Sequence, residues 1–208
     1  MRGKCFIAAQ LLFLIKAMFV CNKLLLGLTG SISTLMMPYN IFFLRQKFAQ
    51  EVNVIMTYTA QQLITPYAIE LCSGAPVFTR HTQISDSINV PHIELPADSD
   101  LFLIMPATAN VLAKAAHGIC DDLLSTAIVS CKTAVVFVPS MNEAMWTSRI
   151  VQQNVNHLKS LGHYVIEPMQ GYEIANMQPI YGVMPPIETV VFKLNEILHP
   201  PSASSASL

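Results

Sequence analysis

Four short stretches of the chain combine hydroxyl, amide and small side chains, and each directly follows an apolar, strand-like run. They are Thr29-Gly30-Ser31, Thr57-Tyr58-Thr59, residues 106–111 (PATANV) and residues 139–146 (PSMNEAMW). In open parallel sheets, ligands bind beyond the carboxyl ends of the strands. We therefore expect the four stretches to meet at one edge of a sheet and to form a ligand site there.

The first two stretches have the chemistry of an anion site. Backbone N–H groups and hydroxyls bind phosphate where a strand turns into a helix, which makes Gly30 and Ser31 candidates. The hydroxyls of residues 57–59, at the end of the next strand, could reach the same phosphate. A plain turn capped by Ser31, together with a polar strand end, also explains these residues. The glycines lack the GxGxxG spacing of a dinucleotide-binding fingerprint.

The other two stretches suit a flat ring and a carboxylate. Small side chains at positions 107–109 would let a ring approach the backbone, and Asn110 could hydrogen-bond the edge of a heterocycle. Asn142 lies between Met141 and Met145, and its side-chain amide can donate to a carboxylate while its carbonyl accepts. The alternatives are a helix N-terminal turn for the first stretch and a Met and Trp cluster in the core for the second.

His92 is the histidine that best suits catalysis, because it precedes a predicted strand and does not lie inside a predicted helix. Imidazole titrates near neutral pH, which suits proton transfer or hydrogen bonding to a reacting group. A structural or solvated histidine is the alternative, and we expect only that role for His81, His117, His157 and His163.

A metal site is not predicted. No two histidines have zinc-ligand spacing with a carboxylate or a thiol. A late loop over residues 171–176 could be a mobile lid or a simple connection.

The rest of the sequence alternates strand-like and helix-like segments that must position these residues. The predicted strands are residues 23–29, 51–57, 101–105, 133–138 and 163–167. The predicted helices are residues 35–48, 60–73, 107–116, 123–130, 146–161 and 187–198. Pro66 either breaks the second helix or begins a new one, and residues 74–91 and 170–186 are predicted loops. The alternation predicts an α/β, Rossmann-like three-layer fold with a central parallel sheet.

Composition excludes several classes of protein. With a formal net charge of −1, the chain lacks the broad positive field that a nucleic-acid binder needs. The five cysteines are odd in number and form no CxxC pair, so we interpret them as small buried hydrophobes and not as disulfides or zinc ligands. Hydrophobic residues make up 52% and charged residues 12% of the chain, which indicates a membrane segment or large apolar subunit interfaces.

The 208 residues suit one domain, which we place at residues 23–198 between an N-terminal extension (1–22) and a disordered tail (199–208). In the extension, Arg2 and Lys4 precede an apolar run, as in a signal peptide, but no convincing cleavage site follows. The run is also short against the ~20 residues of a membrane span. We favour a third interpretation, in which translation starts at Met18.

Three features, in this order, resemble the homo-oligomeric flavin-containing cysteine decarboxylases. That family has a His, then Pro-Ala-Ser-Ala-Asn-Thr, then Pro-x-Met-Asn-x-x-Met-Trp; here these are His92, residues 106–111 and residues 139–146. The last motif matches completely, whereas Thr108 replaces Ser and Val111 replaces Thr in the one before it. Between them, the sequence Gly-Ile-Cys-Asp-Asp-Leu also looks like a stretch of the family. The resemblance covers about residues 23–198.

The resemblance implies FMN as the cofactor, with its phosphate near the first two stretches and its ring near the third. The implied cofactor-binding residues are Gly30, Ser31, Ile32, Thr57, Tyr58, Thr59, Thr108, Ala109, Asn110, Val111 and Ser140. It implies trimers with flavin at the subunit interface, often assembled into dodecamers, which agrees with the apolar composition.

The resemblance also assigns the catalytic and substrate-binding residues. His92 matches the active-site His of the family, and Asn142 matches the Asn that is expected to hold the substrate carboxylate. The implied substrate-binding residues are Met141, Asn142, Met145, Tyr172 and Glu173. We expect a cytoplasmic enzyme that has no nucleic-acid or membrane partner.

The family has two branches, which act on the C-terminal cysteine of lantibiotic precursor peptides (epidermin and mersacidin type) or on phosphopantothenoylcysteine. The second branch has a catalytic Cys in a late loop, but no cysteine follows Cys131 here. Residues 167–176 look instead like the peptide-clamping loop of the mersacidin type. The resemblance therefore implies oxidative decarboxylation of a peptide that stops at the enethiol. The alternatives are a phosphopantothenoylcysteine decarboxylase with another reductant, a flavin prenyltransferase, or a non-catalytic flavin-binding regulatory subunit.

Overall fold

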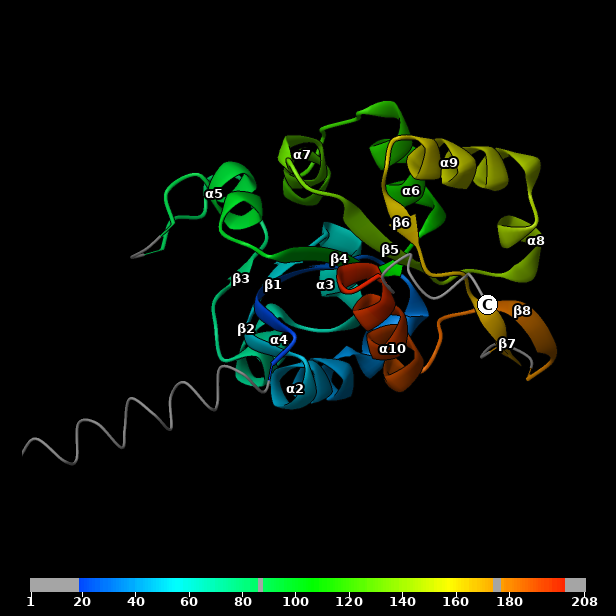
Figure 1. Cartoon of the computed structure of the whole chain (residues 1–208), viewed down its shortest axis with the longest axis horizontal. Coiled ribbons are helices and arrows are strands. Elements are labelled where there is room, and N and C mark those ends of the chain that lie inside the picture. The colour runs from blue at the N-terminus through cyan, green and yellow to red at the C-terminus, as the bar shows by residue number, and fades with distance from the viewer. Residues whose placement is uncertain (1–18, 86–87, 174–176, 201–208) are drawn as a thin grey trace, which may run out of the picture.

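The computed structural model has a central sheet of six parallel strands with helices on both faces (Figure 1). This arrangement confirms the predicted fold class. The model describes residues 19–85, 88–173 and 177–200. The predictions for residues 1–18 and 201–208, and for part of the 171–176 loop, lie outside these ranges. The order of strands in the sheet is β3-β2-β1-β4-β5-β6.

The strands of the sheet alternate with helices along the chain. The strands are β1 (Cys21–Leu28), β2 (Ala49–Met56), β3 (Val77–Phe78), β4 (Leu101–Ala107), β5 (Val135–Pro139) and β6 (Tyr164–Val165). The helices are η1 (Ile32–Met36), α2 (Met37–Lys47), α3 (Tyr58–Leu63), α4 (Pro66–Ser73), α5 (Pro91–Ala97), α6 (Ala109–His117), α7 (Leu123–Ser130), α8 (Glu143–Trp146), α9 (Arg149–Ser160) and α10 (Ile187–Leu198). A separate antiparallel hairpin consists of β7 (Met169–Tyr172) and β8 (Pro179–Val183).

The central strands are buried on both faces, as their unbroken apolar runs predict. Because side chains alternate along a strand, Leu103 enters one core cluster, with residues of α2 and α10, while Phe102 and Ile104 enter the other, with residues of α6, α7 and α9. Figure 1 shows α6, α7 and α9 above the sheet and α2 and α10 below it.

Two helices, α3 and α6, begin directly after a strand because a threonine side chain caps each of them. Thr57 accepts a hydrogen bond from the backbone N–H of Ala60, and Thr108 accepts one from Val111. Asp122 caps α7 in a reciprocal capping box with Ser125, which confirms the predicted start of that helix. The caps at Thr57 and Thr108 turn the chain directly after β2 and β4, at the carboxyl edge of the sheet, whereas α7 follows α6.

Four predicted boundaries were wrong for identifiable reasons. The 74–91 loop contains β3, an edge strand too short for a periodic signal. The 170–186 loop contains most of the β7–β8 hairpin, whose exposed MQGY strand has no apolar alternation. The predicted 146–161 helix corresponds to α9, which begins only at Arg149, and the short helix α8 before it was not predicted. The first strand starts at Cys21, inside the proposed extension, because Cys21 pairs with Ala49.

Prolines account for two further outcomes. Pro66 begins α4, which is one of the two alternatives the sequence left open. Pro106 does not stop β4, which continues to Ala107 through a cis Met105–Pro106 peptide bond. His92 lies inside α5, so the expectation that it lies outside any helix was wrong.

The cysteines confirm the expected chemistry only in part. Cys21 is buried, and burial, with the nearby charge of Asp100, raises the pKa of its thiol to about 12. Cys72 and Cys131 are half-buried and form no disulfide, but Cys120 is exposed, so the interpretation as a buried hydrophobe is wrong for that residue.

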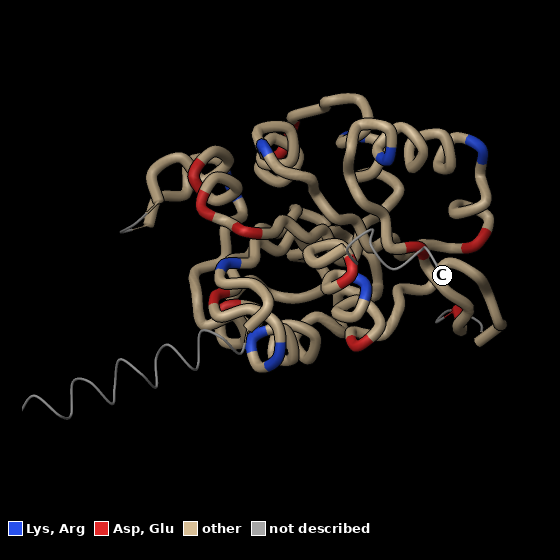
Figure 2. Tube along the Cα trace, viewed as in Figure 1, with Lys and Arg blue, Asp and Glu red and all other residues tan. Residues whose placement is uncertain are grey.

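Charged side chains of the described residues do not gather by sign on one element. Figure 2 shows Lys and Arg scattered over several elements and interspersed with Asp and Glu. No helix in the described ranges is both long enough and apolar enough to cross a membrane.

His163 provides a test of this packing. Burial lowers the pKa of His163 below its usual 6.5, and its Nδ1 accepts a hydrogen bond from the backbone N–H of Val135 (3.2 Å). The unfolded chain therefore takes up this proton first as the pH falls, so the stabilisation is present above about pH 6.5 and is lost as the pH drops through 6.5 toward the lowered pKa. We expect His163→Asn, which keeps an acceptor that does not titrate, to lose less Tm than the native chain between neutral and mildly acidic pH.

His199→Asn, a change at an exposed position, is the matched control for this measurement. Equal loss of Tm in the native chain and in His163→Asn would contradict the assignment.

Candidate functional site

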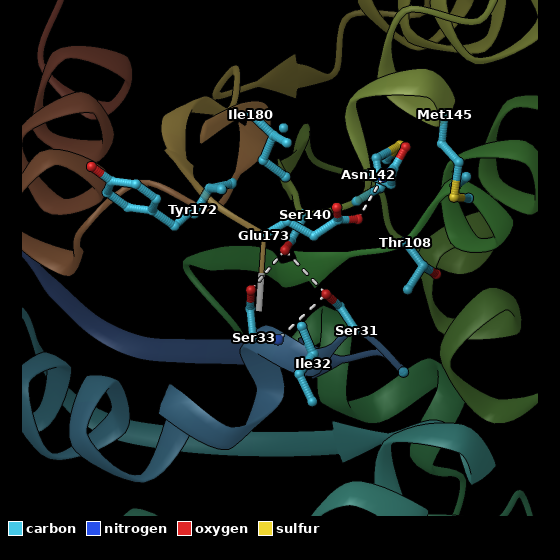
Figure 3. A pocket seen from close by; sticks show the side chains of 15 residues that line it. Ser31, Ile32, Ser33, Thr108, Ser140, Asn142, Met145, Tyr172, Glu173 and Ile180 are labelled. Carbon is cyan, nitrogen blue, oxygen red and sulfur yellow. Dashed lines mark hydrogen bonds between the residues drawn. The ribbon is translucent and has the colours of Figure 1, made fainter. Parts of the chain in front are cut away.

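A cavity of about 490 Å³ opens at the carboxyl edge of the sheet, where the sequence predicts a ligand site (Figure 3). Segments that follow β1, β4 and β5 line it, together with the β7–β8 hairpin. The lining residues are Gly30, Ser31, Ile32, Ser33, Thr108, Ala109, Ser140, Met141, Asn142, Met145, Tyr172, Glu173, Ile180, Gly182 and Val183. Three of the four predicted stretches therefore do meet.

Three serine hydroxyls converge at one end of the cavity (Figure 3). Ser31 Oγ donates to Ser140 Oγ (3.0 Å), and Ser33 Oγ lies 2.7 Å from the same atom. Ser31 and Ser140 are buried. Hydroxyls held this close, beside Gly30 in the cavity lining, can donate together to the oxygens of one phosphate. We call this group, Ser31, Ser33 and Ser140, the serine cluster.

Buried hydrogen bonds join the strand ends that carry the serine cluster. Thr29 Oγ1 donates to the carbonyl of Pro106 (2.7 Å) and accepts from the backbone N–H of Thr108 (3.0 Å). The backbone N–H of Ser140 donates to the carbonyl of Ala107 (3.0 Å). These bonds therefore hold the ends of β1, β4 and β5 in one geometry. The sequence predicted Thr29 only as part of a turn.

Gly30 is required by a close approach of the chain. A Cβ at this position would overlap the side chain of Thr59, which packs directly over the Gly30 backbone. Thr59 therefore supports the cavity from outside without lining it. Thr57 caps α3, and Tyr58 is 76% exposed, so the second predicted stretch does not line the cavity in a single chain.

Asn142 is held by hydrogen bonds at both ends of its amide. Its Oδ1 accepts from the backbone N–H of Ala144 (2.8 Å), which begins α8. Its Nδ2 donates to Glu173 Oε1 (2.7 Å), at the end of β7 in the hairpin (Figure 3). The side-chain NH₂ group of Asn142 therefore faces the cavity and already binds a carboxylate.

The hairpin is joined to the Asn142 loop through its backbone. The N–H of Met141 donates to the carbonyl of Gly182 in β8 (3.1 Å). A Cβ at Gly182 would overlap the carbonyl of Met141, and its φ of +149° is one that L side chains rarely adopt. Close packing of two backbones therefore brings Glu173 to Asn142.

The remaining predicted site residues lie outside this cavity. Asn110 is exposed on α6, and Val111 is buried in the core. His92 lies on α5, and its buried Nδ1 has no hydrogen-bond partner among the described residues. A single chain therefore does not bring His92 and Asn142 to a common cavity.

Sequence reasoning missed four lining residues. Ser33 follows Ser31 by two positions, and this spacing is a signal that could have identified it. Ile180, Gly182 and Val183 had no usable signal, because their strand was predicted as a loop. In the described part of the chain, no group of three or more His, Cys, Asp or Glu could hold a metal ion.

Comparisons with known proteins agree with this geometry. A family model described as Flavoprotein matches residues 17–199. The mersacidin decarboxylase of Bacillus sp. (strain HIL-Y85/54728) is 34% identical over 171 residues, which are 79% of this chain and 85% of that protein. The phosphopantothenoylcysteine decarboxylase of Mus musculus is 33% identical over 180 residues, 85% of this chain and 87% of that protein. The crystal structure of SpaF, one of the FMN-dependent cysteine decarboxylases, has a TM-score of 0.71 at 33% identity and covers 84% of this chain and 96% of that chain.

Gly182 tests how the hairpin is attached. We expect Gly182→Ala to separate β8 from Met141, because the new Cβ meets backbone that cannot rotate away. The expected cost is about 1–3 kcal/mol of stability, together with faster hydrogen exchange at the Met141 amide. Thermal unfolding and amide exchange measure the two effects.

Gly162→Ala is the matched control, because Gly162 also has positive φ (+89°) but nothing lies within 4 Å of its Cβ position. If both variants lose the same stability and Met141 exchange is unchanged, the close contact has no role beyond backbone strain.

Proposed function

The chain belongs to the Flavoprotein family, and on that premise we propose that it decarboxylates the C-terminal cysteine of a lantibiotic-type precursor peptide oxidatively, with FMN as its cofactor. Membership of the family and the similarity to two decarboxylases indicate a flavin-dependent decarboxylase. The peptide substrate is our proposal. The carboxylate of Glu173 on the Asn142 amide supports a carboxylate site in the cavity, and the absence of a cysteine after Cys131 favours a peptide as its ligand.

The cavity fits FMN. The serine cluster and the Gly30 backbone would hold the phosphate, where three hydroxyls converge at 3.0 Å and 2.7 Å. Thr108 and Ala109 are small enough for a flat ring to lie against the end of β4. Apolar side chains would cover the rest of the ring; these are Ile32, Met141, Met145, Ile180 and Val183. When bound, FMN supplies the redox chemistry by taking a hydride from the carbon that bears the thiol.

Asn142 would bind the terminal carboxylate of the substrate. Its Oδ1 is committed to the N-terminus of α8, so only its NH₂ group can face a ligand. An NH₂ group donates and cannot accept, so it favours a carboxylate over another donor. Glu173 accepts from this NH₂ group at 2.7 Å, and in our proposal the substrate carboxylate takes its place.

Decarboxylation would then follow from the oxidised substrate. Removal of a hydride from the side-chain carbon and of the thiol proton gives a C=S group β to the carboxylate. The C–CO₂ bond breaks, its electron pair moves toward sulfur, and a proton completes the enethiol. Asn142 orients the carboxylate throughout, and His92 would hold or deliver the proton at sulfur.

His92 reaches the cavity only if copies of the chain associate, which we propose as a trimer or dodecamer. A single chain keeps His92 away from the cavity lining, so a neighbouring copy would supply it. The surface supports association, because η1 and α2 expose a stripe of large apolar side chains at helical spacing. The stripe consists of Ile32, Leu35, Met36, Tyr39 and Phe42, each 45–59% exposed.

The main alternative is phosphopantothenoylcysteine decarboxylation, since the mouse relative is as similar as the bacterial one (33% and 34% identity). The absence of any cysteine after Cys131 favours the peptide, because the resemblance to that branch calls for a late catalytic Cys. The β7–β8 hairpin, with Tyr172 and Glu173 on the cavity, is a surface that a peptide could pair with.

A substrate comparison tests the proposal. We expect the FMN-loaded enzyme to convert a Cys-terminated peptide with loss of CO₂ and two hydrogens by mass spectrometry, with bleaching of the flavin absorbance. Phosphopantothenoylcysteine should remain unchanged. Turnover of that compound alone would overturn the peptide assignment.

Two substitutions test the residue roles in the same assay. We expect Asn142→Asp to abolish decarboxylation, because a second carboxylate repels that of the substrate, and His92→Asn to abolish it by removing the proton carrier. Both variants should still bind FMN, since neither residue belongs to the serine cluster. Asn195→Asp on α10, far from the cavity, is the control and should keep full turnover. Full turnover in either test variant would remove the residue from the mechanism.

Glu173 tests the carboxylate position. We expect Glu173→Gln to lower KM for the peptide by about three- to tenfold, because the neutral amide competes less well with the substrate carboxylate for Asn142. Steady-state kinetics with the same peptide measure the change, and kcat should stay within about twofold. Glu143→Gln, a neighbouring exposed carboxylate, is the control. An unchanged KM in Glu173→Gln would mean that the substrate does not displace Glu173.

A further inference from the structure

His81, for which the sequence indicated only a structural or solvated role, lies against the ring of His92. We propose that His81 is a positioning residue that fixes the orientation of the His92 imidazole. This inference rests on the role proposed above for His92 and adds a residue that no part of that mechanism uses.

Hydrogen bonds hold the backbone of His92, but none from the described residues holds its ring. The carbonyl of His92 accepts from Ser130 Oγ on α7. The start of α5 is fixed by Glu94, whose carboxylate accepts from the backbone N–H of Val90 (2.9 Å) and of Asn89 (3.2 Å). The ring nitrogen Nδ1 is buried and has no hydrogen-bond partner in the described ranges.

A histidine that handles protons usually has its second nitrogen oriented by a carbonyl or a carboxylate. Without such a partner, the ring can turn about χ2, because that torsion is broad. Rotation would move Nε2, the nitrogen left to meet a ligand, away from its direction of approach. Another contact must therefore orient the ring.

The His81 ring supplies that contact. The two ring centroids are 5.5 Å apart and the ring planes meet at 64°, an edge-to-face arrangement. An edge-to-face neighbour blocks rotation of a planar ring, because turning the ring drives its edge into the neighbour. His81 thus limits the positions open to His92 without forming a hydrogen bond to it.

A chain of hydrogen bonds holds His81 itself. Its Nε2 lies 3.0 Å from Thr126 Oγ1 on α7, and that hydroxyl donates its proton to the carbonyl of Asp122 (2.8 Å). Because the Thr126 proton is committed, His81 Nε2 must be the donor and Thr126 the acceptor. The tautomer of His81 is therefore set by α7.

The far end of this chain is an ion pair. Lys114 Nζ lies 2.7 Å from Asp122 Oδ2 and 2.6 Å from Asp121 Oδ1. Burial opposes the charge on Lys114, but the hydrogen bonds to Asp121 and Asp122 outweigh it and raise the pKa of the ammonium. Asp122 also caps α7, so the helix that carries Thr126 starts at a fixed place. Each of these contacts therefore fixes the position of the next residue, from Lys114 through Asp122 and Thr126 to His81 and then His92.

The experiment combines kinetics with NMR of the full-length, FMN-loaded protein. In His81→Ala we expect kcat for the Cys-terminated peptide to fall by about tenfold or more, with KM within about twofold, because a misplaced group weakens the reaction and not the binding. The ring resonances of His92, in histidine-labelled protein, should shift and broaden as the ring gains freedom.

Further variants separate ring packing from hydrogen bonding. His81→Phe keeps an aromatic ring but cannot donate to Thr126, so its kcat should lie between those of the native chain and His81→Ala. Thr126→Val, which loses the hydroxyl, should also lower kcat. Thr126→Ser, which keeps the hydroxyl, should have the kcat of the native chain. His157→Ala is the matched control, because His157 forms a similar exposed ring pair with His117 (centroids 6.4 Å apart) away from the cavity, and it should change nothing.

Unchanged His92 resonances in His81→Ala would overturn the proposal. So would an unchanged kcat in His81→Ala when His92→Asn is inactive. If His92→Asn keeps full turnover, the role of His92 in the proposed function is lost, and the resonances still decide whether His81 orients the ring.

Discussion

The hydroxyl of Thr29 is the point on which the site depends. It is buried, donates to the carbonyl of Pro106 and accepts from the N–H of Thr108, so it joins the end of β1 to the end of β4. Thr34 on η1 donates to the Thr29 carbonyl (2.6 Å), which also ties the turn after β1 into this junction. A buried polar group gains its stability only when it is fully paired, so this geometry leaves little freedom. The serine cluster, the floor for a flat ring and the start of α6 all take their positions from it.

The second constraint is the contact between two backbones at Met141 and Gly182. It makes the hairpin part of the cavity wall, although the hairpin is not part of the main sheet. The same contact brings the acidic side chain of Glu173 to the amide of Asn142. The cavity therefore has one end suited to a phosphate, at the tips of the strands, and another suited to a carboxylate, at the hairpin.

The sequence predicted those parts of the molecule whose signal is local. Buried apolar runs identified β1, β4 and β5, and the helix predicted over residues 123–130 agrees with α7. Motifs at strand ends identified Ser31, Ser140 and Asn142 as members of one site. The parts that were missed depend on partners distant in sequence: β3 and the hairpin exist through pairing, and Thr29 and His81 matter through contacts 45 to 79 residues away. The positions of Thr57, Tyr58 and His92 relative to the cavity could not be derived from one chain, because the expected site is shared between copies.

The two edges of the sheet are much shorter than its centre. β3 and β6 have two residues each, while β1 and β2 have eight and β4 has seven. A strand of two residues offers too few free N–H and C=O groups to serve as a template for another chain. The sheet is therefore closed to growth by strand addition, and uncontrolled fibre-like stacking is disfavoured by architecture alone. In the association proposed above, contacts around the main sheet would therefore use side chains of its covering helices and not strand edges.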